Sequence, residues 1–157
     1  MGQFTQEAAE HFVYGAECAA SGRIDEAELA FAKAVVLAPD WHIARYQLGL
    51  LQFSSGRAAV ALVTWAPLFD LALSNCLAHF VRGFASLAQD DFAQATAHFR
   101  TGLALPIDNA ALAGDVEKVL ARIEHLQGGA RPVTVTSDDA ASSHVLLSNY
   151  GRIGNLH

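Results

Sequence analysis

Seven histidines and two cysteines are the residues of this chain that could bind a metal ion or perform acid–base chemistry. His79 and His98 fall on successive predicted helices, and Asp91 between them could complete a ligand set. The close spacings that hold a metal, such as HExxH on one helix, do not occur in the sequence. Histidines in such isolated positions are usually solvated or packed at the edge of a core. We therefore predict no metal site and no cofactor.

The two cysteines, Cys18 and Cys76, are predicted to be buried thiols. They lie far apart in the sequence and form neither a CxxC pair nor a Cys/His spacing typical of zinc. Glu17 precedes Cys18, and no Lys or Arg is adjacent in the sequence, so nothing there indicates an activated thiol.

Other catalytic motifs are also missing from the sequence. It contains no GxSxG, GxxxxGK[ST] or GxGxxG pattern, and its glycine cluster GRIG, residues 151–154, does not open a predicted helix. We predict that the protein is not an enzyme. A small metal-dependent enzyme remains the catalytic alternative.

The composition limits the possible partners. The 157 residues are 52% hydrophobic and 17% charged, which is typical of one globular domain rather than a disordered chain. The net charge is −6 and the only lysines are Lys33 and Lys118, which argues against nucleic acid and membrane surfaces as partners. No secretion signal and no uncharged apolar run of about 18 residues is found, so we expect a cytoplasmic protein.

The elements that would position these residues follow a period of 34 residues. Three columns of small or aromatic residues recur in step: Gly15, Gly49 and Gly83; Ala27, Ala61 and Ala95; Phe31, Trp65 and Phe99. Each unit has the pattern of two amphipathic helices, and the turns between them hold Gly22, Gly56 and Asp90. The small residues would let two helices approach, and the aromatic residue would fill the gap between hairpins. The pattern predicts an all-α fold of three helix hairpins.

Prolines and glycines set the expected boundaries. Pro39 ends the first unit, and Pro67 predicts a bend or break near Ala66. A capping helix should follow the third hairpin and stop at Gly128 and Gly129. Its apolar face would hold Leu112, Val116, Val119, Leu120 and Ile123. We thus assign residues 4–128 to a helical solenoid and residues 129–157 to a tail.

The tail has a different character from the hairpins. The segment PVTVT alternates with the period of a β-strand, and HVLLSNY is a second short apolar run. This short, non-repeat and β-like tail should pack on the solenoid groove or on a second copy, which would make a homodimer.

With these columns, residues 8–109 resemble the tetratricopeptide repeat family, although His11, Arg45 and His79 stand at the family's tryptophan position. The resemblance implies an α-α superhelix whose first helices line a concave groove. The residues at inward-facing positions would bind a peptide, and they are Phe12, Ala16, Tyr46, Leu50, Phe53, Phe80, Phe84 and Leu87. An exposed apolar surface of this size usually marks an interaction site. The alternative is that these rings form the internal core of the array.

The resulting functional hypothesis is a non-catalytic adaptor or chaperone-like module that binds an apolar helical or extended peptide. The groove could instead hold the chain's own tail or that of a second copy. The inward positions lack the Lys, Asn and Arg residues with which some family members hold a chaperone's terminal carboxylate. The small, acidic chain is also similar to the three-repeat bacterial chaperones of type III secretion, so a hydrophobic secreted client is the second possibility.

Overall fold

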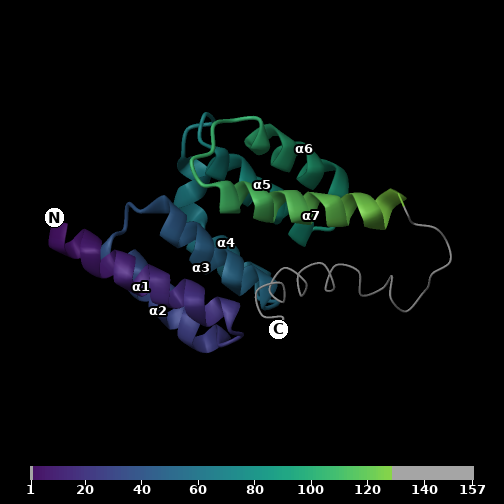
Figure 1. The fold of residues 1–157 in the computed structure, drawn as a ribbon. Coiled ribbons are helices and arrows are strands. Elements are labelled where there is room, and N and C mark those ends of the chain that lie inside the picture. The colour runs from purple at the N-terminus through teal and green to yellow at the C-terminus, as the bar shows by residue number, and fades with distance from the viewer. Residues whose placement is uncertain (1, 129–157) are drawn as a thin grey trace. The chain divides into compact units, whose positions relative to one another are not determined.

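The computed structural model describes residues 2–128 of the chain, with side chains from residue 6 onward. This range holds seven α-helices, one short 3-10 helix and no strand, which confirms the predicted all-α class (Figure 1). The elements in chain order are α1 (Gly2–Ala20), α2 (Ile24–Leu37), α3 (His42–Ser54), α4 (Ala58–Thr64), η1 (Ala66–Asp70), α5 (Cys76–Ala88), α6 (Phe92–Leu103) and α7 (Ala110–Gly128). The predicted tail, residues 129–157, lies outside the described residues.

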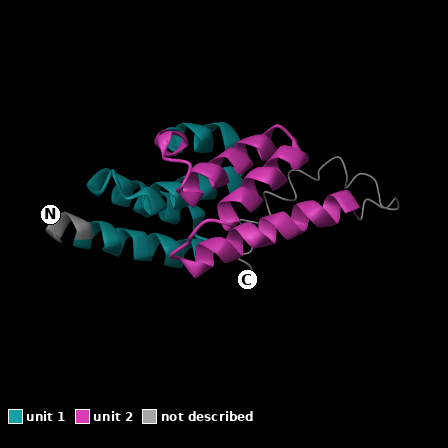
Figure 2. Cartoon of the chain, turned by 90° about the horizontal axis from the view of Figure 1, so that it is seen from above, with its two compact units in different colours: residues 1–66, 147–157 teal, residues 67–146 magenta. Residues whose placement is uncertain are grey.

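The helices pack as sequential hairpins within two compact units (Figure 2). In the first unit, residues up to Ala66, α1 packs on α2, α2 on α3 and α3 on α4. In the second unit, which begins at Pro67, α5 packs on α6 and α6 on α7. The three predicted hairpins are therefore α1–α2, α3–α4 and α5–α6.

Three nearly identical turns close these hairpins. In each turn a backbone amide donates to the carbonyl five residues earlier: Arg23 to Cys18 at 2.8 Å, Arg57 to Gln52 at 2.9 Å and Asp91 to Ser86 at 2.9 Å. The residue before each donor has a positive φ, 82° at Gly22, 88° at Gly56 and 60° at Asp90. This is the usual geometry for ending a helix on a left-handed residue. The period of 34 residues thus exists in the backbone as well as in the sequence.

The glycine and aromatic columns meet inside each hairpin. A Cβ placed on Gly15 would lie 2.7 Å from the Phe31 ring, and Cβ atoms on Gly49 and Gly83 would run into Trp65 and Phe99. The second-helix alanines Ala27, Ala61 and Ala95 are fully buried. The aromatic ring therefore fills a notch against the first helix of its own hairpin, whereas the sequence placed it in the gap between hairpins.

The second hairpin ends as Pro67 predicts. Helix α4 stops at Thr64, and the chain continues as the 3-10 helix η1. Pro67 has no amide hydrogen with which to continue the α-helical ladder. The predicted break near Ala66 is confirmed.

The predicted capping helix is α7, and it packs on α6. Asn109, just before α7, caps the start of the helix. Its Oδ1 accepts hydrogen bonds from the backbone amides of Ala111 at 2.9 Å and Leu112 at 3.2 Å. Four of the five predicted apolar positions are buried and Leu120 is half-buried; the buried four are Leu112, Val116, Val119 and Ile123.

Candidate functional site

Most of the residues predicted to line a groove are enclosed. Six of them are at most 4% exposed, namely Tyr46, Leu50, Phe53, Phe80, Phe84 and Leu87. Of the other two, Phe12 is half-buried and Ala16 is exposed.

The enclosed rings pack against the second helix of their own hairpin. Trp65 of the second hairpin stacks against Tyr46 and Phe53, each with ring centroids 5.9 Å apart. Its Nε1 donates a hydrogen bond of 3.0 Å to the Tyr46 carbonyl oxygen. In the third hairpin Phe84 meets Phe99 edge to face at 4.9 Å. These rings thus form hairpin interior, which is the alternative the sequence left open, and peptide binding by them stays a prediction.

Phe12 belongs to the junction between the first two hairpins. Its ring lies 5.4 Å from Phe31 and 4.9 Å from Trp41, measured between centroids. It packs on a buried cluster that includes Phe31, Leu48 and Leu51. Phe12 therefore helps to seat α3 on the first hairpin.

A network of polar side chains also joins these hairpins. Gln52 on α3 is only 6% exposed, and both ends of its amide are satisfied: Nε2 donates to Glu28 at 3.1 Å, and Oε1 accepts from the Thr64 hydroxyl at 2.6 Å. Arg57, just before α4, donates to the other Glu28 oxygen at 2.6 Å. The Arg57 guanidinium and Gln52 hold the pKa of the Glu28 carboxyl below its ordinary value, against the opposing effect of burial.

Two of the three large aliphatic residues that the first hairpin exposes lie on α2, and the third, Val13, lies on α1. Leu29 is 59% exposed and Val36 is 76% exposed. Ala32 lies between them and is half-buried, in contact with the core cluster of the hairpin. The three residues are spaced by three and four, so they lie on one side of the helix. The residues that α2 buries lie on the opposite side, and they are Ala27, Ala30, Phe31 and Ala34. We call Leu29, Ala32 and Val36 the α2 seam.

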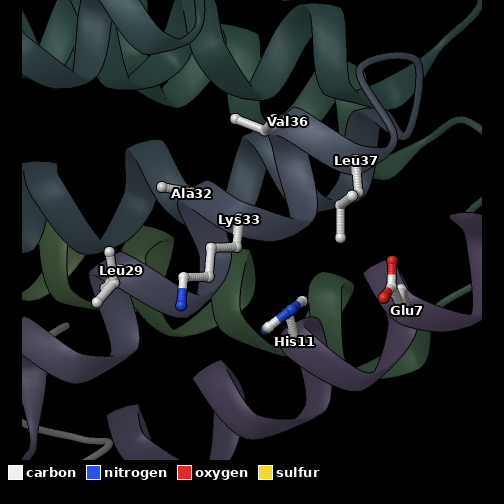
Figure 3. Close-up of a pocket in the computed structure, with 7 residues that line it drawn as sticks. All are labelled: Glu7, His11, Leu29, Ala32, Lys33, Val36 and Leu37. Atoms are coloured by element: carbon white, nitrogen blue, oxygen red, sulfur yellow. The ribbon is translucent and has the colours of Figure 1, made fainter.

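The α2 seam lines one wall of an open cleft of about 540 Å³ between α1 and α2. Figure 3 shows its lining: Glu7 and His11 come from α1, and the five others come from α2. The α2 residues are Leu29, Ala32, Lys33, Val36 and Leu37. The cleft thus combines an aliphatic wall with one cation and one carboxylate at its rim.

Sequence reasoning missed this site because it looked for binding residues only on the first helix of each hairpin and did not consider the aliphatic residues of α2. The available signal was that α2 is apolar on two opposite sides. Successive residues of a helix are turned by about 100° around its axis. This spacing separates the buried side of α2, centred on Ala34, from the side that holds Leu29 and Val36.

The face of α1 that corresponds to the stacking face of α3 is polar. On α3 that face includes Leu48 and Leu51, and with Trp41, the residue just before the helix, they pack against the first hairpin. The residues 34 positions earlier on α1 are Glu7, Tyr14 and Glu17. All three are exposed, so this face of α1 lies in water.

The turn after α1 changes the surroundings of Cys18, which is fully buried. It brings Arg23 close to Cys18 and places the Arg23 guanidinium 5.9 Å from the centre of the Tyr14 ring. A hydrogen bond between Tyr14 and Cys18 raises the pKa of the Tyr14 hydroxyl. The sequence showed no basic residue next to Cys18, because Arg23 reaches it only through the fold.

The histidines that suggested a metal lie near one another in the second unit. Burial lowers the pKa of His98, and the nearby His79 and Arg82 lower it further, while Asp91 acts in the opposite direction. The described residues contain no group of three His, Cys, Asp or Glu side chains that could hold a metal ion. For the second cysteine, Cys76, burial raises the pKa of the thiol.

Within residues 2–128, no helix is both long enough and apolar enough to cross a membrane. No family model, curated protein or solved structure matches this chain.

Proposed function

We propose that this chain is a tetratricopeptide-like, non-catalytic interaction module that binds an amphipathic helix on the α1–α2 face. The observation that carries the proposal is the α2 seam, where Leu29 and Val36 are exposed beside the apolar cleft. The repeated turns and glycine notches support the family assignment, because they recur at the family's period.

The energetics favour an occupant on this face. Burying an exposed Leu or Val side chain completely contributes about 1.5–3 kcal/mol. Anchors spaced by three and four residues match one side of a helix, so a helical partner can engage all of them together. At the rim, Lys33 and Glu7 would select for complementary charges on the partner.

A photo-crosslinking amino acid at Val36 tests the proposal in the cells from which the protein comes. The matched control is Val63 on α4, because its side chain is 75% exposed, compared with 76% for Val36. We expect position 36 to crosslink to a defined helical segment that position 63 does not capture. Equal labelling from both positions would contradict the proposal.

A further inference from the structure

We infer that the helix bound by the α1–α2 face is α2 of a second copy of this chain, laid antiparallel across a two-fold axis. The inference rests on the proposed function and identifies its partner. Three features of α2 carry it: the spacing of its seam, the charges on one flank and the fixed carboxylate on the other.

The seam has the spacing of a helix-pairing interface. Leu29, Ala32 and Val36 occupy a, d and a positions of a heptad, and Asp25 takes the preceding d position. In an antiparallel pair, Leu29 of one copy lies against Ala32 of the other, and Val36 lies against the outer turn at Asp25. The seam therefore matches itself, with large residues facing small ones or the helix end.

The charges on one flank of the seam are self-complementary. Glu26 and Lys33 both occupy e positions, and e positions of antiparallel helices face one another. Lys33 of each copy thus meets Glu26 of the other, so the two-fold axis generates this ion pair twice. The existing Arg23–Glu26 pair is no obstacle, because its side chains are 49% and 53% exposed and such pairs contribute little.

The other flank selects the antiparallel direction. In a parallel pair, Lys33 would face the g position of the partner helix, which is Glu28. Glu28 is already held by Arg57 at 2.6 Å and by Gln52 at 3.1 Å. Exchanging these contacts for Lys33 would break the network between the first two hairpins.

The size of the seam sets the expected affinity. Helix α2 has 14 residues and is therefore about 21 Å long. A pair of such helices buries less than the roughly 800 Å² per partner of a standard stable interface. We expect a dimer that forms at protein concentrations on the order of 100 µM.

Charge exchange tests the pairing in the full chain by analytical ultracentrifugation. Lys33→Glu and Glu26→Lys should each weaken the dimer about tenfold, and the double variant should restore it, because the ion pair is re-formed with its signs reversed. Lys118→Glu and Glu117→Lys on α7 are the matched controls, because they change the net charge equally at residues that are not part of the seam. Failure of the double variant to recover the dimer would overturn the pairing.

The apolar part of the seam is tested by Val36→Asp, which should weaken the dimer about tenfold or more. Val63→Asp is the control, and circular dichroism should show that both variants keep their helices, since both positions are exposed. For the direction, Asp25→Cys protein mixed with Val36→Cys protein should form a disulfide between copies. Val36→Cys protein alone should not, because two copies of residue 36 are far apart in an antiparallel pair.

Each other outcome has a defined meaning. A chain that is monomeric at all concentrations overturns the inference, and so does a dimer that Val36→Asp leaves intact, since another surface or residues 129–157 would then join the copies. If Val36 crosslinks only to a different protein, the proposed function stands and the inference fails. If Val36 captures nothing beyond the Val63 background, both fail.

Discussion

Asp90 shows at the scale of one residue how the repeat tolerates variation. It adopts a φ of 60° at the position where the other two turns use Gly22 and Gly56. The left-handed region costs an L-residue roughly 1 kcal/mol, and aspartate is one of the few residues that visit it regularly. The third turn therefore keeps its geometry at a small expense in stability.

Replacing Asp90 with glycine should raise the free energy of unfolding by about 0.5–1 kcal/mol, because it relieves this conformational cost. Gly56→Asp is the reciprocal variant, since its φ is 88° and no atom lies within 4 Å of an added Cβ. We expect it to destabilise the protein by about 1 kcal/mol. Urea unfolding measures both changes, and a loss of stability in Asp90→Gly would show that the aspartate side chain matters more than its backbone.

Glu28 gives a residue-scale prediction for pH. Its folded-state pKa is lowered, mainly by the hydrogen bond from Arg57, so the carboxylate stabilises the folded state above its unfolded pKa of about 4.3. This contribution is lost as the pH falls through the lower, folded pKa. At pH 7 we expect Glu28→Gln to cost about 0.5–1 kcal/mol, since the ion pair is partly exposed to solvent.

The measurement for Glu28 is the stability difference between Glu28→Gln and the parent chain in urea from pH 7 to pH 3. The difference should shrink toward zero at the acidic end. Glu117→Gln on the exposed side of α7 serves as the control and should change stability little at any pH. A difference that stays constant across this range would contradict the role given to the carboxylate.

At the scale of helices, the close packing at the glycine notches predicts that replacing such a glycine destabilises the protein, although helix propensity alone predicts the opposite. Gly49→Ala gains about 1 kcal/mol of intrinsic propensity but pushes a Cβ into the Trp65 ring. Because crowding in a packed core costs about 1–3 kcal/mol, we expect a net loss of stability. Gly114→Ala on α7 is the control, since nothing lies within 4 Å of its added Cβ, and it should be stabilising. A stabilising Gly49→Ala would mean that the notch has room to spare.

The positions of the helices could be predicted from the sequence, but their rotation about their own axes could not. The columns predicted the three hairpins and the places of their turns, Pro67 predicted the break near Ala66, and the apolar spacing predicted the buried side of α7, because each depends on local sequence. The environment of Tyr46 and Phe80 depends on how each first helix is rotated about its axis. A period along the sequence fixes which residues are equivalent but leaves that rotation to packing.

The exposed site escaped prediction for a related reason. Leu29 and Val36 are as apolar as any core residue, and although their spacing puts them on the side opposite Phe31, the sequence does not say which of the two apolar sides faces α1. In the same way, Arg23 approaches Cys18 only after the turn at Gly22 has formed.

At the scale of the whole molecule, pairing of two copies would link stability to concentration. Any species that binds only the folded chain raises its apparent stability by mass action. We therefore expect the thermal midpoint to rise between about 10 and 300 µM protein, and Val36→Asp to remove that dependence. Differential scanning calorimetry measures the midpoint, and Val63→Asp should behave as the parent chain does. If the thermal midpoint rises with protein concentration by the same amount in Val36→Asp as in the parent chain, self-association through α2 is contradicted.

The placement of Trp65 has a practical consequence. Its indole is fully buried, hydrogen-bonded to the Tyr46 carbonyl and stacked against two rings. A tryptophan shielded from water emits at short wavelength, and its emission maximum shifts to longer wavelength when water reaches the indole. With the second tryptophan replaced, as in Trp41→Phe, the chain therefore carries an optical reporter for the closure of α3 on α4 that needs no added label.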